Sequence, residues 1–198
     1  MGRIVITEFI SMDGVMQAPG GEKFKYEGWS FEFDRGESGG EFKAREIFEA
    51  EAQLIGRVTY ESFAGAWPRY EQEWEGDAKE FARRFNSMPK FVVSATLEDP
   101  DWTNCTVIDG DGDVPAEVAK LKEEIAGNIL VSGSRRLAQE LLEHDLVDEL
   151  RLMVFPVVLG TGDRLFGEFS DKSTWQLAES NPVGSDGVLT LVYQRSEG

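Results

Sequence analysis

The sequence predicts an α/β fold in which a largely parallel sheet is closed by two antiparallel strands. Over the first two-thirds of the chain, short β-branched runs alternate with helical stretches, the pattern of parallel strands joined by crossover helices. The helical stretches then stop, and two strand-like runs, Trp175–Glu179 and Val188–Tyr193, are separated by the turn residues Asn181-Pro182 and Gly184. The 198 residues contain no repeat, linker or low-complexity tract, so we expect one domain, residues 1–198.

The first strand is predicted from Ile4-Val5-Ile6 and Phe9-Ile10, and Ser11-Met12-Asp13-Gly14 ends it. The stretch from Gln17 to Gly40 has no clean period and is rich in glycine and aromatic residues. Such a long loop suits either a lid that closes over a ligand or a satellite of the core, and the sequence leaves both open.

The remaining elements follow from apolar periodicity and turn residues. Helices are expected over Glu41–Glu51, Thr59–Ala64, Asp77–Phe85, Val114–Ile125 and Arg135–Glu143. Strands are expected over Ala52–Ile55, Lys90–Ser94, Cys105–Ile108, Asn128–Val131 and Asp148–Val158. Asp77 is a candidate helix cap, and Pro115 stands near a helix start, where proline is tolerated.

Charge and composition narrow the class of protein. The formal net charge of −17 repels nucleic acid and anionic membranes, so neither is expected as a partner. No run approaches the ~20 apolar residues of a membrane-spanning helix, and the single cysteine, Cys105, suits a reducing compartment. We therefore expect a cytoplasmic protein. Because the one histidine, His144, has no neighbouring ligands in the sequence, no metal site is expected.

The segment Gly56-Arg57-Val58-Thr59 is the first candidate site, because it follows the predicted strand Ala52–Ile55 and opens a helix. Glycine lets the backbone approach a ligand closely, and a helix N-terminus offers free N–H groups to a phosphate. Arg57 has a planar fork suited to phosphate, and Thr59 can cap the helix or bind a phosphate oxygen. By itself the segment is at least as compatible with an ordinary helix start.

A second turn repeats the pattern, because Ser132-Gly133-Ser134-Arg135-Arg136 also follows a predicted strand and opens a helix. Two such turns in one sheet favour an anionic dinucleotide, although each is also compatible with a tight turn and surface arginines. Ser94-Ala95-Thr96 and Asp13-Gly14 end two other strands and give weaker signals, since these residue types are common in turns. The G-x-G-x-x-G fingerprint of a standard dinucleotide site is absent.

Several motifs resemble a known family. Gly56-Arg57-Val58-Thr59-Tyr60-Glu61-Ser62 resembles the G-R-x-T-x-E-S segment of dihydrofolate reductases. Ser11–Gly14, Ser132–Ser134, Leu146–Leu150 and Pro156–Phe166 are similar to the reductase domain of the bifunctional deaminase-reductase of riboflavin biosynthesis and to its stand-alone relatives. These motifs occur in the expected order over nearly the whole chain.

The resemblance implies an NADPH-binding reductase with a mixed, mainly parallel sheet of about eight strands flanked by helices. It places Arg57 and Thr59, with Gly56 and Val58, at the cofactor phosphates, Ser94 and Thr96 near the adenosine, and Gly133, Ser134 and Arg135 at the pyrophosphate. Asp13, Gly14 and Val15 would approach the nicotinamide, and residues 17–40 would form the lid. Stand-alone relatives are often dimers, so a homodimer is expected.

The chain also departs from the family. It lacks the zinc deaminase domain, and no residue clearly matches the carboxylate that helps to protonate the pterin in dihydrofolate reductases. Glu41 is the nearest candidate by position, but an acid in a first helical turn also complements the helix dipole. The sequence thus predicts hydride transfer from NADPH to a small, pterin- or pyrimidine-like substrate. A non-catalytic NADPH-binding or sensing protein, and a domain that binds another phosphorylated ligand, stay open.

Overall fold

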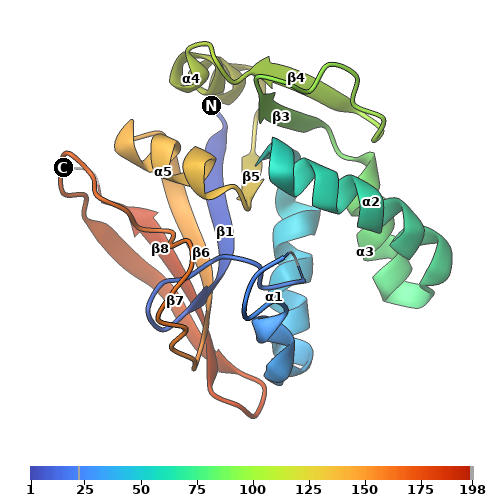
Figure 1. Cartoon of the computed structure of the whole chain (residues 1–198), viewed down its shortest axis with the longest axis vertical. Coiled ribbons are helices and arrows are strands. Elements are labelled where there is room, and N and C mark those ends of the chain that lie inside the picture. Colours follow the sequence, from blue (N-terminus) through green and yellow to red (C-terminus); the bar gives the residue numbers. More distant parts are fainter. Residues whose placement is uncertain (22, 197–198) are drawn as a thin grey trace.

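A computed structural model describes residues 1–21 and 23–196, and it confirms the mixed α/β fold (Figure 1). In chain order the elements are β1 (Arg3–Ser11), the short 3-10 helix η1 (Trp29–Glu32), α1 (Gly36–Glu49), β2 (Ala50–Gly56), α2 (Arg57–Glu73), α3 (Gly76–Ser87), β3 (Lys90–Ser94), β4 (Cys105–Asp109), α4 (Val114–Glu124), β5 (Asn128–Ser132), α5 (Arg135–Glu143), β6 (Val147–Phe155), β7 (Trp175–Val183) and β8 (Val188–Arg195).

The described strands form one eight-stranded sheet in the order β4-β3-β2-β5-β1-β6-β8-β7. The pairs from β4 to β6 are all parallel, and β8 is antiparallel to both β6 and β7. Both the mainly parallel sheet and its antiparallel C-terminal strands are therefore confirmed.

β1 shows why both faces of the sheet are covered. Ile4 and Ile6 pack in a core with α4 and α5, whereas Val5 packs on the opposite face with residues of α1, α2 and α3. Figure 1 shows α4 and α5 on one side of the sheet and α1, α2 and α3 on the other. A strand that is buried on both faces has a nearly continuous run of apolar residues. The prediction of β1 was based on such a run.

α1 begins at Gly36, earlier than the predicted start at Glu41. The Asp34 carboxylate accepts a hydrogen bond from the Gly36 N–H at 2.8 Å, which supports this earlier start. Gly39, taken as part of the loop, lies inside the helix. A Cβ at that position would lie 2.6 Å from Cβ of Arg35, so the glycine makes room for the arginine. The helix also ends at Glu49, and Glu51 belongs to β2.

α2 extends well beyond the predicted range Thr59–Ala64, and it continues through Pro68 to Glu73. Proline inside a helix removes a hydrogen bond and costs stability. Here the Trp67 ring stacks on Phe85 of α3, with the ring centroids 4.1 Å apart. Burial of aromatic surface between α2 and α3 offsets the local cost of the proline.

Three smaller differences concern element ends. The N-cap of α3 is Glu75, without a side-chain cap, so the prediction that Asp77 caps this helix is wrong. β6 ends at Phe155 rather than near Val158. Asn181 and Pro182, predicted as turn residues, pair with Thr190 and Leu189 inside β7. Because β7 lies at the sheet edge, its proline need not donate to a neighbouring strand.

The aromatic residues of the 17–40 stretch divide between core and surface; residue 22 of this stretch lies outside the described part. Trp29 is 1% exposed, its Nε1 donates to the Gln17 carbonyl at 2.9 Å, and its ring contacts Phe155. Phe33 also contacts Phe155, whereas Phe31 is 66% exposed. Core packing therefore accounts for Trp29 and Phe33. None of the helices in the described part of the chain combines the length and the apolar composition that a membrane span requires.

Replacement of Trp29 with alanine is expected to lower the free energy of unfolding by about 3–5 kcal/mol, the usual cost of removing a large buried aromatic side chain. Phe31→Ala, in the same short helix, is the matched control and should change it by less than about 0.5 kcal/mol. Urea denaturation followed by circular dichroism measures both. Equal destabilisation by the two substitutions would contradict the assignment of Trp29 to the core.

Candidate functional site

The candidate site lies where the parallel strands end, at a switch in chain direction. β5 and β1 are neighbours in the sheet, but α1 leads from β1 to β2 on one side and α5 leads from β5 to β6 on the other. Ligands of open α/β sheets bind in the crevice beyond the carboxyl ends of strands at such a switch point. The segments that follow β1, β2 and β5 are therefore the first place to look for a ligand.

The two glycine-containing turns that the sequence singled out meet in space. Thr59 Oγ1 at the start of α2 lies 3.1 Å from Ser134 Oγ at the start of α5. A Cβ at Gly133, whose φ is +71°, would come within 2.5 Å of Thr59 Oγ1. A Cβ at Gly56 would overlap the Ser134 side chain. The close approach of the turns thus requires glycine at both positions.

The helices that start at these turns have N-termini without side-chain caps. The N-cap of α2 is Gly56, which has no side chain, and the N-cap of α5 is Ser134, whose hydroxyl does not bond to the helix. Thr59 bonds to Ser134 instead of capping α2. Two helix N-termini with uncapped first-turn N–H groups present two positive dipole ends to the same region, which suits a diphosphate.

The cations at these turns are held in partly exposed ion pairs. Arg57 Nη1 donates to Glu61 Oε1 at 2.6 Å, and both side chains are about half exposed. Arg135 Nε lies 3.2 Å from Asp163 Oδ1. Because exposed ion pairs contribute only about 0–1 kcal/mol, a phosphate could replace either carboxylate at little cost. Val58, next to Arg57, is 64% exposed.

Ser94 is the last residue of β3 and Thr96 lies in the turn that follows, one strand farther from the crevice than β2. The Ser94 hydroxyl accepts hydrogen bonds from the N–H groups of Thr96 and Leu97 at 3.1 and 2.9 Å, so it shapes this turn. Thr96 is exposed. Of the two hydroxyls, that of Thr96 is the freer to contact a ligand.

A buried carboxylate that the sequence did not reveal ties β1 to the second turn. Glu8 is 6% exposed, and its Oε1 accepts a hydrogen bond from the Gly133 N–H at 2.7 Å. In the sequence, the one sign of its role was an acidic residue inside the apolar run that predicts β1. Glu8 fixes the end of β5 against β1 and thereby positions the Gly133 turn.

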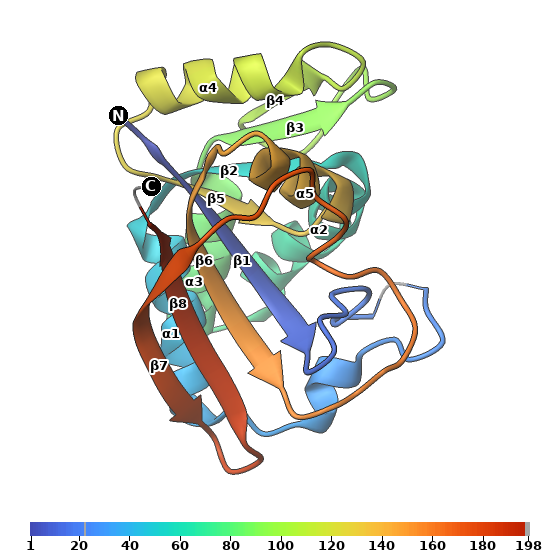
Figure 2. The same cartoon turned by 90° about the vertical axis from the view of Figure 1, so that its left-hand side faces the viewer.

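Asp13 joins the segments that follow β1 and β6, which lie side by side in Figure 2. Its Oδ1 accepts from the Ser11 hydroxyl at 2.7 Å and from the Leu159 N–H at 3.1 Å, and its Oδ2 accepts from the Gly160 N–H at 2.9 Å. Arg164 also contacts Oδ2, at 3.2 Å. The Asp13 carboxylate thus connects the turn after β1 to residues 159–164.

These contacts also set the charge of Asp13. The hydrogen bond from Ser11, helped by the two backbone N–H groups and opposed by burial, lowers the pKa of Asp13 to about 2. Asp13 is therefore ionised at neutral pH, with both oxygens occupied. Next to it, Gly14 has φ +80° and no atom within 4 Å of the position that a Cβ would occupy, and Val15 is fully buried. The geometry favours a positioning role for Asp13 over proton donation.

Glu41 is exposed on α1. Because α1 begins at Gly36, Glu41 lies beyond the first helical turn, and its interpretation as a first-turn acid is wrong. The buried carboxylate of α1 is Glu46, which is 1% exposed. Its Oε2 accepts from the Thr7 hydroxyl at 2.8 Å and pairs with Lys43 Nζ at 2.5 Å. Sequence reasoning missed this group, although Lys43 and Glu46 have the spacing of a helical ion pair.

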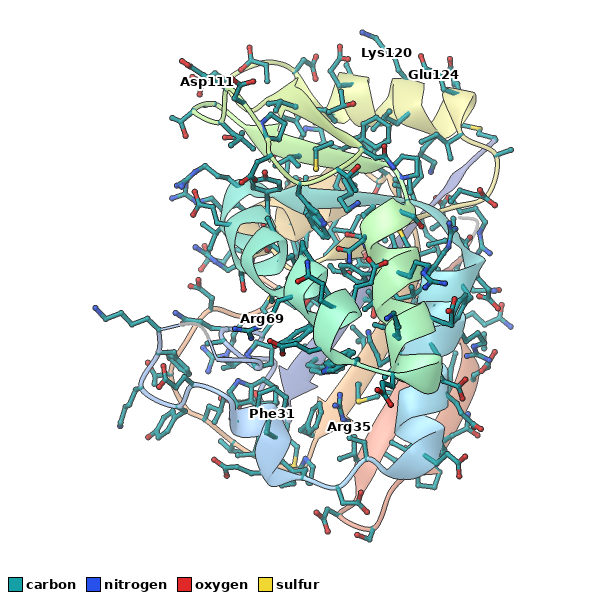
Figure 3. All side chains as sticks on the ribbon, turned by 90° about the vertical axis from the view of Figure 1, so that its right-hand side faces the viewer. Phe31, Arg35, Arg69, Asp111, Lys120 and Glu124 are labelled. Atoms are coloured by element: carbon teal, nitrogen blue, oxygen red, sulfur yellow. The ribbon has the colours of Figure 1, made fainter. Side chains whose placement is uncertain are left out.

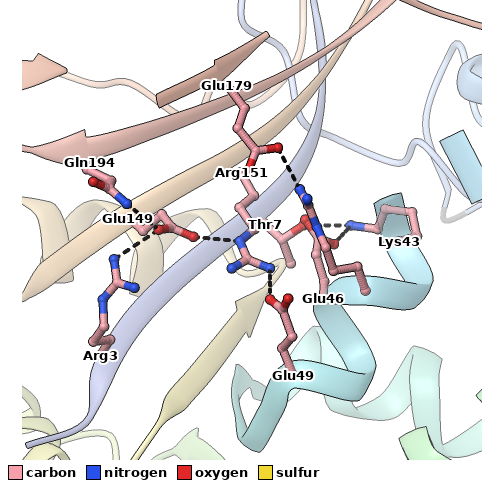
Figure 4. Close-up of polar contacts among 10 residues, drawn as sticks. Arg3, Thr7, Lys43, Glu46, Glu49, Glu149, Arg151, Glu179 and Gln194 are labelled. Atoms are coloured by element: carbon pink, nitrogen blue, oxygen red, sulfur yellow. Dashed lines mark hydrogen bonds and ion pairs between the residues drawn. The ribbon is translucent and has the colours of Figure 1, made fainter. Parts of the chain in front are cut away.

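A cavity of about 100 Å³ lies elsewhere, beside the beginning of β6. An ionic cluster lines it, in which Arg151 bonds to both Glu149 and Glu49 (Figure 4). Burial alone would raise the pKa of Glu149, but the Arg151 hydrogen bond and the charges of Arg151 and Arg3 lower it. Ligand pockets usually measure about 300–1,000 Å³, so this cavity is too small for a dinucleotide. We assign the cluster to structural support.

Known proteins resemble the chain in sequence. Residues 3–189 match the model of the RibD C-terminal domain family. The uncharacterized protein YyaP of Bacillus subtilis (strain 168) is 30% identical over 140 residues, 71% of each chain. YwjB of the same organism is 35% identical over 81 residues, which cover 41% of this chain and 45% of YwjB.

Solved structures share the fold across the whole chain. A candidate riboflavin biosynthesis protein of Shewanella sp. PV-4 has a TM-score of 0.73 at 20% identity and covers 98% of this chain and 99% of its own. A pyrimidine reductase-like protein of Corynebacterium diphtheriae has a TM-score of 0.64 at 12% identity, with 99% and 92% covered. A dihydrofolate reductase of Enterococcus faecalis, in complex with NADP(H) and RAB-propyl, has a TM-score of 0.60 at 14% identity, with 98% and 97% covered.

Asp13→Asn should lower the melting temperature at neutral pH, because the carboxylate holds residues 159–164. Hydrogen bonds to a charged group contribute about 1.5–3 kcal/mol. The pKa of Asp13 is lower in the folded state, so its stabilisation is present above about pH 4 and is lost as the pH falls through about 2. The melting-temperature difference between wild type and variant should therefore shrink over that range, and a constant difference would exclude this role.

Proposed function

The chain belongs to the RibD C-terminal domain family, and on this premise we propose that it is an oxidoreductase that transfers a hydride from NADPH to a small heterocycle, such as a pterin or a pyrimidine. Family membership and the shared fold indicate an oxidoreductase of the dihydrofolate reductase type. The structural neighbours include a pyrimidine reductase-like protein and a dihydrofolate reductase with bound NADP(H), which support the choice of substrate class and cofactor.

The observation that carries this proposal is the meeting of the Gly56–Thr59 and Gly133–Arg135 turns. Thr59 Oγ1 of the first turn lies 3.1 Å from Ser134 Oγ of the second. This contact places the uncapped N-termini of α2 and α5 next to each other. In the proposed complex these turns hold the cofactor phosphates, with Arg57 and Arg135 as the adjacent cations. Ser94 and Thr96 lie toward the adenosine end. NADPH supplies the hydride chemistry when it is bound, and the protein binds and orients it.

At the other end of the site, Asp13, Gly14 and Val15 would lie beside the nicotinamide. Gly14 leaves the backbone open to close approach, while Asp13 fixes the turn through residues 159–164. We propose Asp13 as a positioning residue. Glu41 stays a candidate proton donor because its carboxylate is exposed and forms no hydrogen bond or ion pair within the described part of the chain, and water is the alternative donor.

Absorbance of NADPH, followed in the presence of folates, pterins, flavin precursors and quinones, tests the activity. Thermal melting with NADPH tests the cofactor separately, because a ligand of the native state raises the melting temperature. Binding without turnover of any substrate would favour a non-catalytic NADPH-binding or sensing protein. No stabilisation by NADPH, together with stabilisation by another phosphorylated ligand, would exclude the cofactor proposed here.

Arg57→Ala is expected to weaken NADPH binding by roughly 1.5–3 kcal/mol, the range for a hydrogen bond to a charged group. NADH, which lacks the additional phosphate, should bind nearly as before. Arg69→Ala is the matched control, because Arg69 is on the same helix and also pairs with an acid four residues later, Glu73. Isothermal titration calorimetry measures each affinity. An equal loss for NADPH and NADH would assign Arg57 to the pyrophosphate instead.

We further propose that residues 1–198 form one domain and that the chain is a cytoplasmic homodimer. β1 pairs with β6, which in turn pairs with β8, so strands from the beginning and the end of the chain belong to one sheet, which supports a single domain. β7 is an edge strand that is exposed from Gln176 to Pro182, and Leu177 of β7 and Leu189 of the adjacent β8 are exposed apolar side chains. A partner that covers such an edge would protect it from other strands.

Light scattering after size exclusion should therefore give twice the mass of one chain. Leu177→Lys should shift the protein toward the monomer without a change in its circular dichroism spectrum, because a buried lysine would be costly in a subunit interface. Leu189→Lys is a second test of the same face. A monomeric wild-type protein would exclude the dimer.

A further inference from the structure

Two cationic side chains converge on the ring of Phe9, near the end of β1. The Arg35 guanidinium lies 5.2 Å from the ring centroid, and Lys43 Nζ lies 5.1 Å from it. Arg35 directly precedes α1, and Lys43 is on α1. Like charges in one neighbourhood repel each other, so this arrangement is favourable only where negative charge compensates it.

The two cations differ in their partners. Lys43 Nζ pairs with Glu46 Oε2 at 2.5 Å and donates to Thr7 Oγ1 at 2.6 Å. Within residues 1–21 and 23–196, the Arg35 guanidinium has neither a hydrogen bond nor an ion pair. The neighbouring acid in sequence, Asp34, is engaged elsewhere, since its carboxylate accepts from the Gly36 N–H and from the N–H and hydroxyl of Ser185.

Arg35 is also partly removed from water. Burial lowers the pKa of its guanidinium below the ordinary value, although the group stays charged. Cβ of Arg35 lies against Gly39, which has no side chain to displace it. A partly desolvated cation without a counter-ion is costly, and the chain carries 37 acidic residues that could have paired with it. Arg35 is therefore placed for an anion that the protein itself does not supply.

Phe9 and Arg35 lie at the end of the proposed site where the substrate would bind. Phe9 lies just before Ser11, where the turn with Asp13 and Gly14 begins. Its ring contacts Phe155, the last residue of β6, with the ring centroids 5.3 Å apart. Figure 3 shows Arg35 beside the tip of β1, close to the short helix that carries Phe31. Arg35 is thus at the carboxyl end of the sheet, as are the two phosphate-binding turns.

We propose that Arg35, with Lys43, binds an anionic group of the substrate, either a carboxylate or a phosphate, beside the Phe9 ring. This inference rests on the proposed function, because it assigns the substrate end of the same site. The planar guanidinium can donate two parallel hydrogen bonds to either anion, and Lys43 adds a second positive charge held in place by Glu46.

Matched ligand pairs test the proposal. Orotate is compared with uracil for the carboxylate, and uridine monophosphate with uridine for the phosphate, by titration calorimetry of the protein with and without saturating NADPH. The variants are Arg35→Gln and Arg35→Lys. Arg45→Gln is the control, because Arg45 is on α1 with its guanidinium 5.5 Å from the Phe42 ring centroid, but it pairs with Glu179 at 3.0 Å. Thermal melting checks that each variant is folded.

The wild type should bind at least one anionic ligand more tightly than its neutral counterpart, and the pair that shows the preference identifies the kind of anion. Arg35→Gln should weaken that anion by roughly 10- to 100-fold, the effect of a lost charged hydrogen bond, and leave the neutral ligand unchanged. Arg35→Lys should keep part of the preference, and Arg45→Gln all of it.

The proposal would be overturned if the wild type did not prefer the anionic ligand in either pair, or if Arg45→Gln lost as much affinity for the anion as Arg35→Gln. The same measurements distinguish a failure of the anion site from a failure of the proposed reductase function. If NADPH does not bind, but the protein without NADPH prefers an anion through Arg35, then the anion site stands and the reductase does not. If NADPH binds with equal affinity to wild type and Arg35→Gln, and no anion is preferred, the reductase stands and the anion site does not.

Discussion

The candidate site depends on the close packing of two strand–helix turns, which a side chain at Gly56 or Gly133 would prevent. β2 and β5 are neighbours in the sheet, so the N-termini of α2 and α5 meet there although the two helices cover opposite faces. Glu8 of β1 holds the Gly133 N–H and joins a third strand to the same point. This packing fixes where two helix dipoles end, and with it the region in which a diphosphate is most favourable.

The strands could be predicted from the sequence because each depends on a short local pattern. The ends of α5 could also be predicted, but the start of α1 and the end of α2 could not, because contacts between distant segments decide them. α1 extends back to Gly36 where Asp34 bonds to both the helix and Ser185. α2 continues through Pro68 because Trp67 packs on Phe85 of another helix. Glycine and proline have a low helix propensity, but at these positions tertiary packing outweighs that propensity.

The same limit applies to the candidate site. The glycine-containing turns were recognisable, because small residues, a cation and a helix start stand together in the sequence. Glu46 and Arg35 were not, because their significance depends on Thr7 and Phe9 of β1, which are distant in sequence. Glu41 was chosen by its position at an expected helix start. Once the helix begins at Gly36, the buried acid of α1 is Glu46, and Glu41 faces solvent.

For the partly and deeply buried arginines, acidic partners and burial together separate a structural role from a ligand-binding role better than charge alone. With a net charge of −17, each arginine has many acids available, and Arg3, Arg45 and Arg57 each pair with one in a partly exposed ion pair. Arg151 has two such partners and is deeply buried, as expected of a group that holds strands and helix together (Figure 4). Arg35 has none among the described residues, yet it is partly buried and packed in place. In so acidic a chain, an unpaired arginine at the carboxyl end of the sheet is better explained by a bound anion than by the stability of the fold.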